Sequence, residues 1–295
     1  MTPATLPAIS ATNKLLAVVS NACQTANTRR VYVAHVRGFL HWLGHVPFGR
    51  ESVQAYRAHL IESGKRPVTV NHAVSALKLL AKESAALGWM DQTAAQAVAS
   101  VQSVPRRGVR LGNWLSPEDL QRVLTVPGSD LIGKRDRALL GLLVGGALRR
   151  SEAAGLVVSQ LQRRSGQPCI VDMTGKGGRV RTVPLPEWVA TAVREWLSAA
   201  AITDGMVLRH VTRSGLILGE GLSAAGCWFI VRKLARAAGV TMAPHDLRRT
   251  CAKKLRSAGV DIEQVSKFLG HSSVQTTELY LGGDQDLGVW EGVEW

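Results

Sequence analysis

The stretch HDLRRT (245–250), together with LGHSSVQTTELY (269–280), decides how the second half of this chain folds. Apolar spacing predicts one helix at 246–258 and another at 261–269. Gly270 stands where the second helix should end, because glycine readily adopts the left-handed backbone that closes many helices. Taken singly, the histidines and the tyrosine of these stretches fit core or capping positions as well as a reactive site.

Upstream, the same half contains a strong helix start and one β interruption. Ser116 can cap a helix whose first position is Pro117. Strand-like runs at 169–173 and 179–185 flank TGKGG (174–178), which predicts a hairpin with a glycine-rich turn. Further helices are predicted at 187–200 and 223–238. The expected fold class is mainly α with a small β-hairpin or sheet, an α+β fold.

The first hundred residues are predicted to be helical throughout. Val36, Phe39 and Leu43 recur on one face of a helix at 28–43, and helices at 52–61 and 68–87 complete a small bundle. The segment SVPRRGVR lacks periodicity and is typical of a linker. The expected divisions are a helical domain 1–103, a basic linker 104–112, a second domain 113–283 and a tail 284–295.

A strongly basic composition bounds the function. The 295 residues are 46% hydrophobic, which is typical of a globular protein. Their formal net charge of +14 indicates a polyanionic partner, for which nucleic acid is favoured over an anionic membrane. No window predicts a membrane span, and no secretion signal is visible. The four cysteines form no CxxC pair, so we expect neither zinc nor disulfides, and a cytoplasmic location.

Four polar clusters carry side chains suited to a phosphodiester. Arginines neutralise phosphoryl oxygens, a lysine can protonate a leaving 5′-oxygen, and a tyrosine can attack as a covalent nucleophile. Glu152 follows Arg149 by three residues and can hold it on one helical face. No carboxylate cluster suggests a pair of magnesium ions, so no metal site is expected. The clusters are LRRSE (148–152), the hairpin lysine Lys176, HDLR (245–248) and the segment 271–280.

In their order along the chain, these clusters resemble the tyrosine recombinases, also called the phage integrase family. GALRRSE (146–152) is similar to the family's T-G-L-R-x-S-E box, and GKGGR (175–179) to its lysine hairpin. HDLRRT is similar to its H-x-L-R box, and LGHSS through Tyr280 to its L-G-H-x-x…Y box. The resemblance spans about residues 115–281, and the helical part more loosely resembles a core-binding domain. Ala147 replaces the usual glycine, which bears on the fine positioning of Arg149.

The resemblance implies a site-specific recombinase that cleaves and rejoins DNA through a 3′-phosphotyrosyl intermediate, without metal, ATP or other cofactor. Tyr280 would attack the phosphate, Lys176 would protonate the leaving 5′-hydroxyl, and His245 would be the acid–base partner of the tyrosine. Glu152 would support the arginine that precedes it. The implied catalytic set is Arg149, Lys176, His245, Arg248, His271 and Tyr280.

The expected partners are a double-stranded DNA recombination site and other copies of the chain, as a dimer on each site and a tetramer on two. The acidic tail carries Trp290 and Trp295, which we expect to dock on a neighbouring protomer, or else on its own domain. No membrane partner is expected. Candidate DNA contacts are Arg106, Arg107 and Arg110 in the linker and Arg29, Arg30, Arg37 and Lys78 in the helical domain.

Three other functions remain open at this point. A type IB topoisomerase-like enzyme would share the chemistry but relax supercoils. A non-catalytic DNA-binding regulator on the same fold would need no nucleophile, and an RNA-binding protein would need an aromatic platform that the sequence does not offer. About 110 residues before the second domain suffice for a core-binding domain alone, which favours a simple recombinase over one that also binds distant arm sites.

Overall fold

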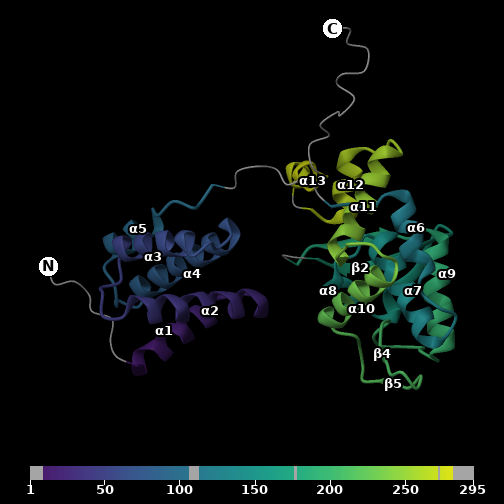
Figure 1. The fold of residues 1–295 in the computed structure, drawn as a ribbon, viewed down its shortest axis with the longest axis horizontal. Helices are drawn as coiled ribbons and strands as arrows, with labels where there is room; N and C mark the ends of the chain where they lie inside the picture. Colours follow the sequence, from purple (N-terminus) through teal and green to yellow (C-terminus); the bar gives the residue numbers. More distant parts are fainter. Residues whose placement is uncertain (1–8, 106–112, 176–177, 272, 282–295) are drawn as a thin grey trace, which may run out of the picture. The chain divides into compact units, whose positions relative to one another are not determined.

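The computed structural model describes residues 9–105, 113–175, 178–271 and 273–281. The chain divides into two compact units, Met1–Gly108 and Val109–Trp295, and the boundary falls inside the predicted linker 104–112. The described residues are mainly helical with two small antiparallel sheets, which confirms the predicted α+β class (Figure 1). None of the described helices combines the length and apolar character that crossing a bilayer requires.

The first unit is a helical bundle whose core lies between the two longest helices. Val36 and Phe39 on one helix, and Leu77 on the other, are fully buried, as the predicted stripes require. Phe39 also meets Tyr56 edge to face, with ring centroids 5.2 Å apart. Burying each such side chain contributes about 1.5–3 kcal/mol. The helices are α1 (Ile9–Ala22), α2 (Ala26–Leu43), α3 (Arg50–Glu62), α4 (Pro67–Ala86) and α5 (Gln92–Ala99).

The helical part of the second unit surrounds one helix that is buried on nearly all sides. From Ala138 to Val144 every residue of α7 is buried, as expected of a central core helix. Helix α9 packs closely against the end of α7, where Gly145 leaves room for Val189. A Cβ at Gly145 would lie 2.4 Å from the Val189 side chain. The helices are α6 (Pro117–Thr125), α7 (Leu131–Val144), α8 (Arg150–Ala154), α9 (Glu187–Ala199), α10 (Ala224–Ala237), α11 (Pro244–Ser257), α12 (Ile262–Leu269) and α13 (Val274–Leu281).

The β-structure of this unit confirms the predicted hairpin and adds to it. Strands β2 (Gln167–Thr174) and β3 (Val180–Pro184) pair antiparallel, and β1 (Leu161–Arg164) extends the sheet on the other side of β2. A second hairpin joins β4 (His210–Val211) to β5 (Ile217–Leu218). The sequence does not predict β1, β4 or β5, because LQRR has no apolar alternation and the other two strands have two residues each.

Helix ends follow local chemistry. The Ser116 hydroxyl accepts from Asp119 N–H, and Gly270 closes α12 with a φ of 64°, both as predicted. Helix α11 begins at Pro244, two residues before the predicted start, because proline suits the first turn and the Asp246 carboxylate accepts from Ala243 N–H. The earlier start places His245 inside the helix, one turn from Arg248.

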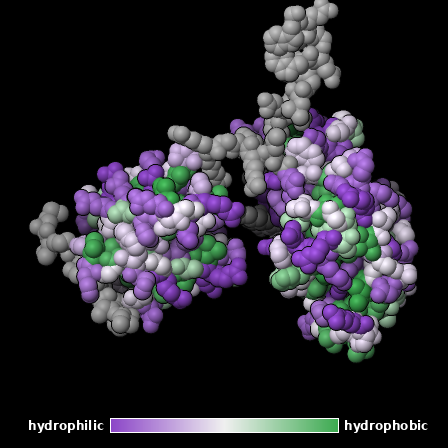
Figure 2. All heavy atoms as spheres, viewed as in Figure 1, coloured by the Kyte–Doolittle hydropathy of each residue, from purple (hydrophilic) through white to green (hydrophobic). Residues whose placement is uncertain are grey.

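Apolar side chains also reach the surface at the β4–β5 hairpin. Figure 2 shows hydrophobic spheres at the end of the second unit where Figure 1 places these two strands. Leu216 and Leu218 are 63% and 50% exposed there. None of the predicted site residues belongs to this hairpin.

Candidate active site

The first catalytic box is held by a capping arrangement at the start of α8. Arg149 is the residue before the helix, and its backbone N–H donates to Glu152 Oε2 at 2.8 Å. Its guanidinium Nη1 donates to Oε1 of the same carboxylate at 2.7 Å. The predicted contact of Arg149 with Glu152 is therefore present, through one backbone donor and one guanidinium donor. The other guanidinium donors are left for a ligand.

Glu152 also binds an arginine that the sequence did not single out. Arg181 on β3 donates to both carboxylate oxygens, at 2.9 and 3.2 Å, and to the carbonyl of Phe268 at 3.2 Å. One side chain thus ties the β2–β3 hairpin to α8 and to the end of α12. The sequence did contain a signal for Arg181. It lies two residues from buried Val183 and so shares the inward face of the strand.

Arg248 is the most buried charge of the site, with 1% exposure. Its two terminal nitrogens donate to the carbonyls of Ala147 and Leu269, and its Nη1 lies 3.9 Å from Glu152. Its Nε has no hydrogen-bond partner among the described residues. Burial, and then the charge of Arg149, lower the pKa of Arg248 to about 10, so the group stays cationic at pH 7.

Ala147, where the resemblance leads us to expect glycine, takes a backbone conformation that glycine readily adopts. It is fully buried and takes a φ of 47°, the left-handed region that glycine adopts without strain. Its carbonyl nevertheless accepts from Arg248. The alanine therefore holds a backbone conformation that glycine adopts more easily, at a conformational cost of about 1–2 kcal/mol.

Tyr280 packs between two histidines of its own chain. Its ring centroid lies 5.0 Å from that of His245 and 5.1 Å from that of His271, both nearly edge to face. Its hydroxyl donates weakly to the His245 carbonyl at 3.4 Å. His271 is oriented from its other side, because Nδ1 lies 2.9 Å from the hydroxyl of fully buried Thr277. The folded chain thus brings Tyr280 close to Arg248 and Arg149, whose charges act on it.

Burial and positive charge set the protonation states of the site. Burial raises the pKa of Tyr280 to about 12, although the charges of Arg248 and Arg249 oppose the rise. Burial, and then nearby arginines, lower the pKa values of His245 and His271 to about 4. Although His245 keeps one side in solvent, both imidazoles are neutral at pH 7. The site therefore holds cations for an anion, a protonated tyrosine, and neutral histidines that can accept or donate a proton.

The remaining predicted residues are exposed, half-buried or outside the described structure. Lys176, Arg106, Arg107 and Arg110 lie outside the described residues. Arg29, Arg30 and Arg37 are exposed on α2, where the first two bond to Ser20 O and Asn27 Oδ1. Lys78 is half-buried on α4. None of these four belongs to the unit that carries Tyr280.

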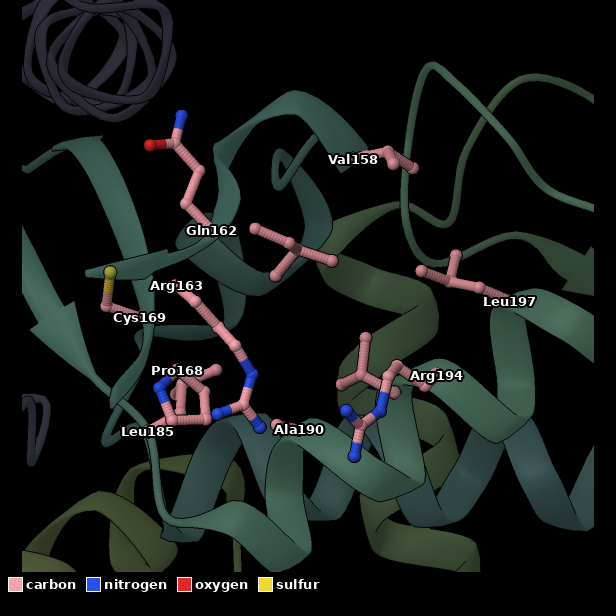
Figure 3. A pocket seen from close by; sticks show the side chains of 11 residues that line it. Val158, Gln162, Arg163, Pro168, Cys169, Leu185, Ala190, Arg194 and Leu197 are labelled. Atoms are coloured by element: carbon pink, nitrogen blue, oxygen red, sulfur yellow. The ribbon is translucent and has the colours of Figure 1, made fainter. Parts of the chain in front are cut away.

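A separate cavity of about 370 Å³ opens between β1, β2 and α9 (Figure 3). Its lining is mainly apolar, and its two arginines, Arg163 and Arg194, both pair with Glu187, at 2.5 and 3.0 Å. No predicted site residue lines it. Because its arginine charges are already compensated and no lining residue could act as a base beside the Cys169 thiol, we do not assign chemistry to it.

Acidification should loosen the site. His271 has a folded pKa of about 4 and an ordinary value of 6.5, so the unfolded chain binds more protons between these values. The contribution of His271 to the free energy of unfolding is therefore complete above about pH 6.5 and declines as the pH drops towards 4. The expected loss between pH 7 and 5 is about 1–2 kcal/mol. Hydrogen exchange of α12 amides, corrected for intrinsic rates, measures this loss. His271→Gln should lose less, and an equal loss in that variant would contradict the assignment.

The fold and this set of side chains define an enzyme that breaks and rejoins DNA strands with a tyrosine. Residues 113–285 match the Phage integrase family. The chain therefore belongs to the phage integrase family, the tyrosine recombinases.

Known relatives match along most of the chain. Tyrosine recombinase XerD of Corynebacterium glutamicum is 31% identical over 286 residues, covering 91% of this chain and 92% of the relative. Tyrosine recombinase XerA of Thermococcus kodakarensis is 30% identical over 257 residues, covering 87% and 85%. A solved XerH recombinase bound to palindromic difH substrate after cleavage has a TM-score of 0.71 at 20% identity, covering 96% and 84%, which supports the fold.

Proposed function

We propose that this recombinase cleaves one strand of a duplex recombination site with Tyr280 and reseals it to a second strand. The observation that carries the proposal is that Tyr280, His245, His271, Arg149 and Arg248 meet in one chain, around donors suited to a phosphate. The guanidinium donors of Arg149 that Glu152 leaves unused can hydrogen-bond the non-bridging oxygens, whose charge grows in the transition state. Buried Arg248 adds a fixed positive charge beside them.

The proposed cleavage step conserves bonds and protons. Tyr280 Oη forms a bond to phosphorus as the bond from phosphorus to the 5′-oxygen breaks. The tyrosine proton passes to neutral His245, and the 5′-oxygen takes a proton, a role for which the sequence offers Lys176. His271, with Nδ1 on Thr277, has Nε2 left for a phosphate oxygen. The phosphotyrosyl bond stores the energy for resealing, so no ATP or metal is required.

Assembly on DNA is inferred from relatives. Solved lambda integrase structures show a dimer bound to a core site and a tetramer bound to a Holliday junction. We infer the same progression here, a dimer on each site and a tetramer on two. Arg29, Arg30 and Arg37, together with the linker arginines, are the proposed phosphate contacts, which makes binding sensitive to salt.

The tail is proposed to hold neighbouring protomers together. A groove on the second unit is lined by half-buried Leu255, Val260 and Phe268 and by exposed Lys267. The segment 284–295 supplies two tryptophans and four carboxylates, Asp284, Asp286, Glu291 and Glu294, which complement an apolar groove with a cationic rim. The proposed occupant of this groove is the tail of a second copy.

Deleting residues 284–295 should leave binding to one site unchanged but reduce the yield of paired sites and recombinants several-fold. Gel-shift titration and junction formation measure the two steps separately. Lys267→Glu should show the same pattern in the full-length protein, because it reverses the charge at the groove. Recombination by the truncated protein at the wild-type rate would exclude the tail contact.

Trapping the covalent complex on a selected DNA site tests the proposed chemistry. A duplex selected from a random library by the wild-type protein supplies the site, which is then nicked so that cleavage traps the covalent complex. A protein–DNA band that survives denaturation supports the proposal. Specific binding without such a band would favour a regulator that uses the recombinase fold to bind DNA only.

A further inference from the structure

Arg249 lies against the ring of Tyr280, the proposed nucleophile. It directly follows Arg248 in the sequence, but none of the roles assigned above uses it. Its guanidinium carbon Cζ is 5.1 Å from the centroid of the Tyr280 ring, within the range of a cation–π contact. The side chain is half-buried on α11, beside Arg248, and its Nε has no hydrogen-bond partner among the described residues. A partly desolvated cation is thus held at the ring rather than at an acidic side chain.

This contact discriminates between the two protonation states of the tyrosine. A neutral phenol ring attracts a cation through its quadrupole, by about 0.5–1 kcal/mol at exposed sites and about 2 kcal/mol when desolvated. A phenolate spreads its negative charge into the same ring, so the attraction to the cation increases. A group that binds the phenolate better than the phenol lowers the free energy of ionisation.

The charges around Tyr280 favour its ionisation, and Arg249 is one of the two largest. Burial alone raises the pKa of Tyr280, and the charges of Arg248 and Arg249 are the largest charges that oppose it. Arg248 is occupied by two backbone carbonyls, whereas no acidic side chain is paired with Arg249 in the described part of the chain. The charge of Arg249 also lowers the pKa of His245, so that ring is unprotonated at pH 7.

We propose that Arg249 activates Tyr280, by stabilising its phenolate through the ring face, and so sets the rate of strand cleavage. This role rests on the proposed function of Tyr280 as nucleophile. Arg249 acts through Tyr280 and is a positioning and electrostatic residue rather than a group that touches the phosphate.

The first test needs no DNA. The chain has three tyrosines, Tyr32, Tyr56 and Tyr280, so Tyr32→Phe with Tyr56→Phe leaves Tyr280 alone. Incorporating 3-fluorotyrosine into that protein lets ¹⁹F NMR follow ionisation of this one side chain. Arg249→Gln should raise the pKa of Tyr280 by about half a unit or more, and Arg249→Lys should recover part of the shift. Lys254→Gln, which removes an exposed charge from the same helix, should leave it unchanged.

The second test measures the trapped cleavage reaction at saturating DNA. Arg249→Gln should slow covalent-complex formation about three- to tenfold at pH 7 and by the same factor at about pH 9, because Tyr280 stays protonated in both proteins over this range. Thermal unfolding checks that the variant is folded. A Tyr280 pKa that does not move in Arg249→Gln overturns the proposal. So does weaker DNA binding with an unchanged cleavage rate, which would make Arg249 a phosphate contact. Failure of the wild type to form any covalent complex would instead defeat the proposed function, and the DNA-free titration separates the two failures.

Discussion

Tyr280→Phe should abolish the covalent protein–DNA complex while leaving site affinity within about twofold. The substitution removes one oxygen, which is the atom that would bond to phosphorus, and removal of a nucleophile lowers turnover by roughly four orders of magnitude or more. The fold should tolerate the change, because the hydroxyl's hydrogen bond to the His245 carbonyl is long, at 3.4 Å. The phenyl ring keeps its packing between the two histidines.

The measurement runs wild type and variant on the nicked selected duplex, followed by a denaturing gel. Tyr32→Phe is the matched control, since it removes the same atom from the helical unit, and it should cleave at the wild-type rate. A covalent band from Tyr280→Phe would assign the nucleophile to another residue.

Glu152→Ala should destabilise the second unit by about 3–5 kcal/mol. The carboxylate is 4% exposed and joins Arg149 and Arg181, with Arg248 at 3.9 Å. Burial by itself would raise the pKa of Glu152, but hydrogen bonds and charge from Arg181 and Arg149 outweigh it and the pKa lies below its usual value. The Glu152 carboxylate therefore stabilises the fold at pH values above its pKa in the unfolded chain. This stabilisation is lost as the pH falls through its lower pKa in the folded protein.

Urea unfolding of the full chain measures this loss, and Glu187→Ala is its matched control. Glu187 also meets two arginines, Arg163 and Arg194, but its side chain is 54% exposed, so its removal should cost less than about 1 kcal/mol. Equal losses from the two variants would show that burial of the Glu152 cluster contributes nothing. Glu152→Gln should fall between them, since it keeps the shape and loses the charge.

Residues close together in the sequence were enough to predict several helix ends and the candidate clusters. Helix α6 starts where Ser116 and Pro117 predict, and α12 ends at Gly270, because caps and stops depend on residues within one turn. The candidate clusters could also be identified from the sequence, because residues such as Glu152 and Arg149 are neighbours along the helix. The three strands β1, β4 and β5 were not, since so few residues carry no period.

The sequence by itself determined the candidate site residues and the helices that carry most of them, because periodicity and capping act over a few residues. Only the tertiary structure decided how they meet. Arg248 is 101 residues from the Ala147 carbonyl it binds, and Arg181 is 29 residues from Glu152. The contact of Arg249 with the Tyr280 ring is of the same kind. Such contacts depend on how whole helices pack, and a buried charge acquires its partner and its pKa only once that packing excludes water.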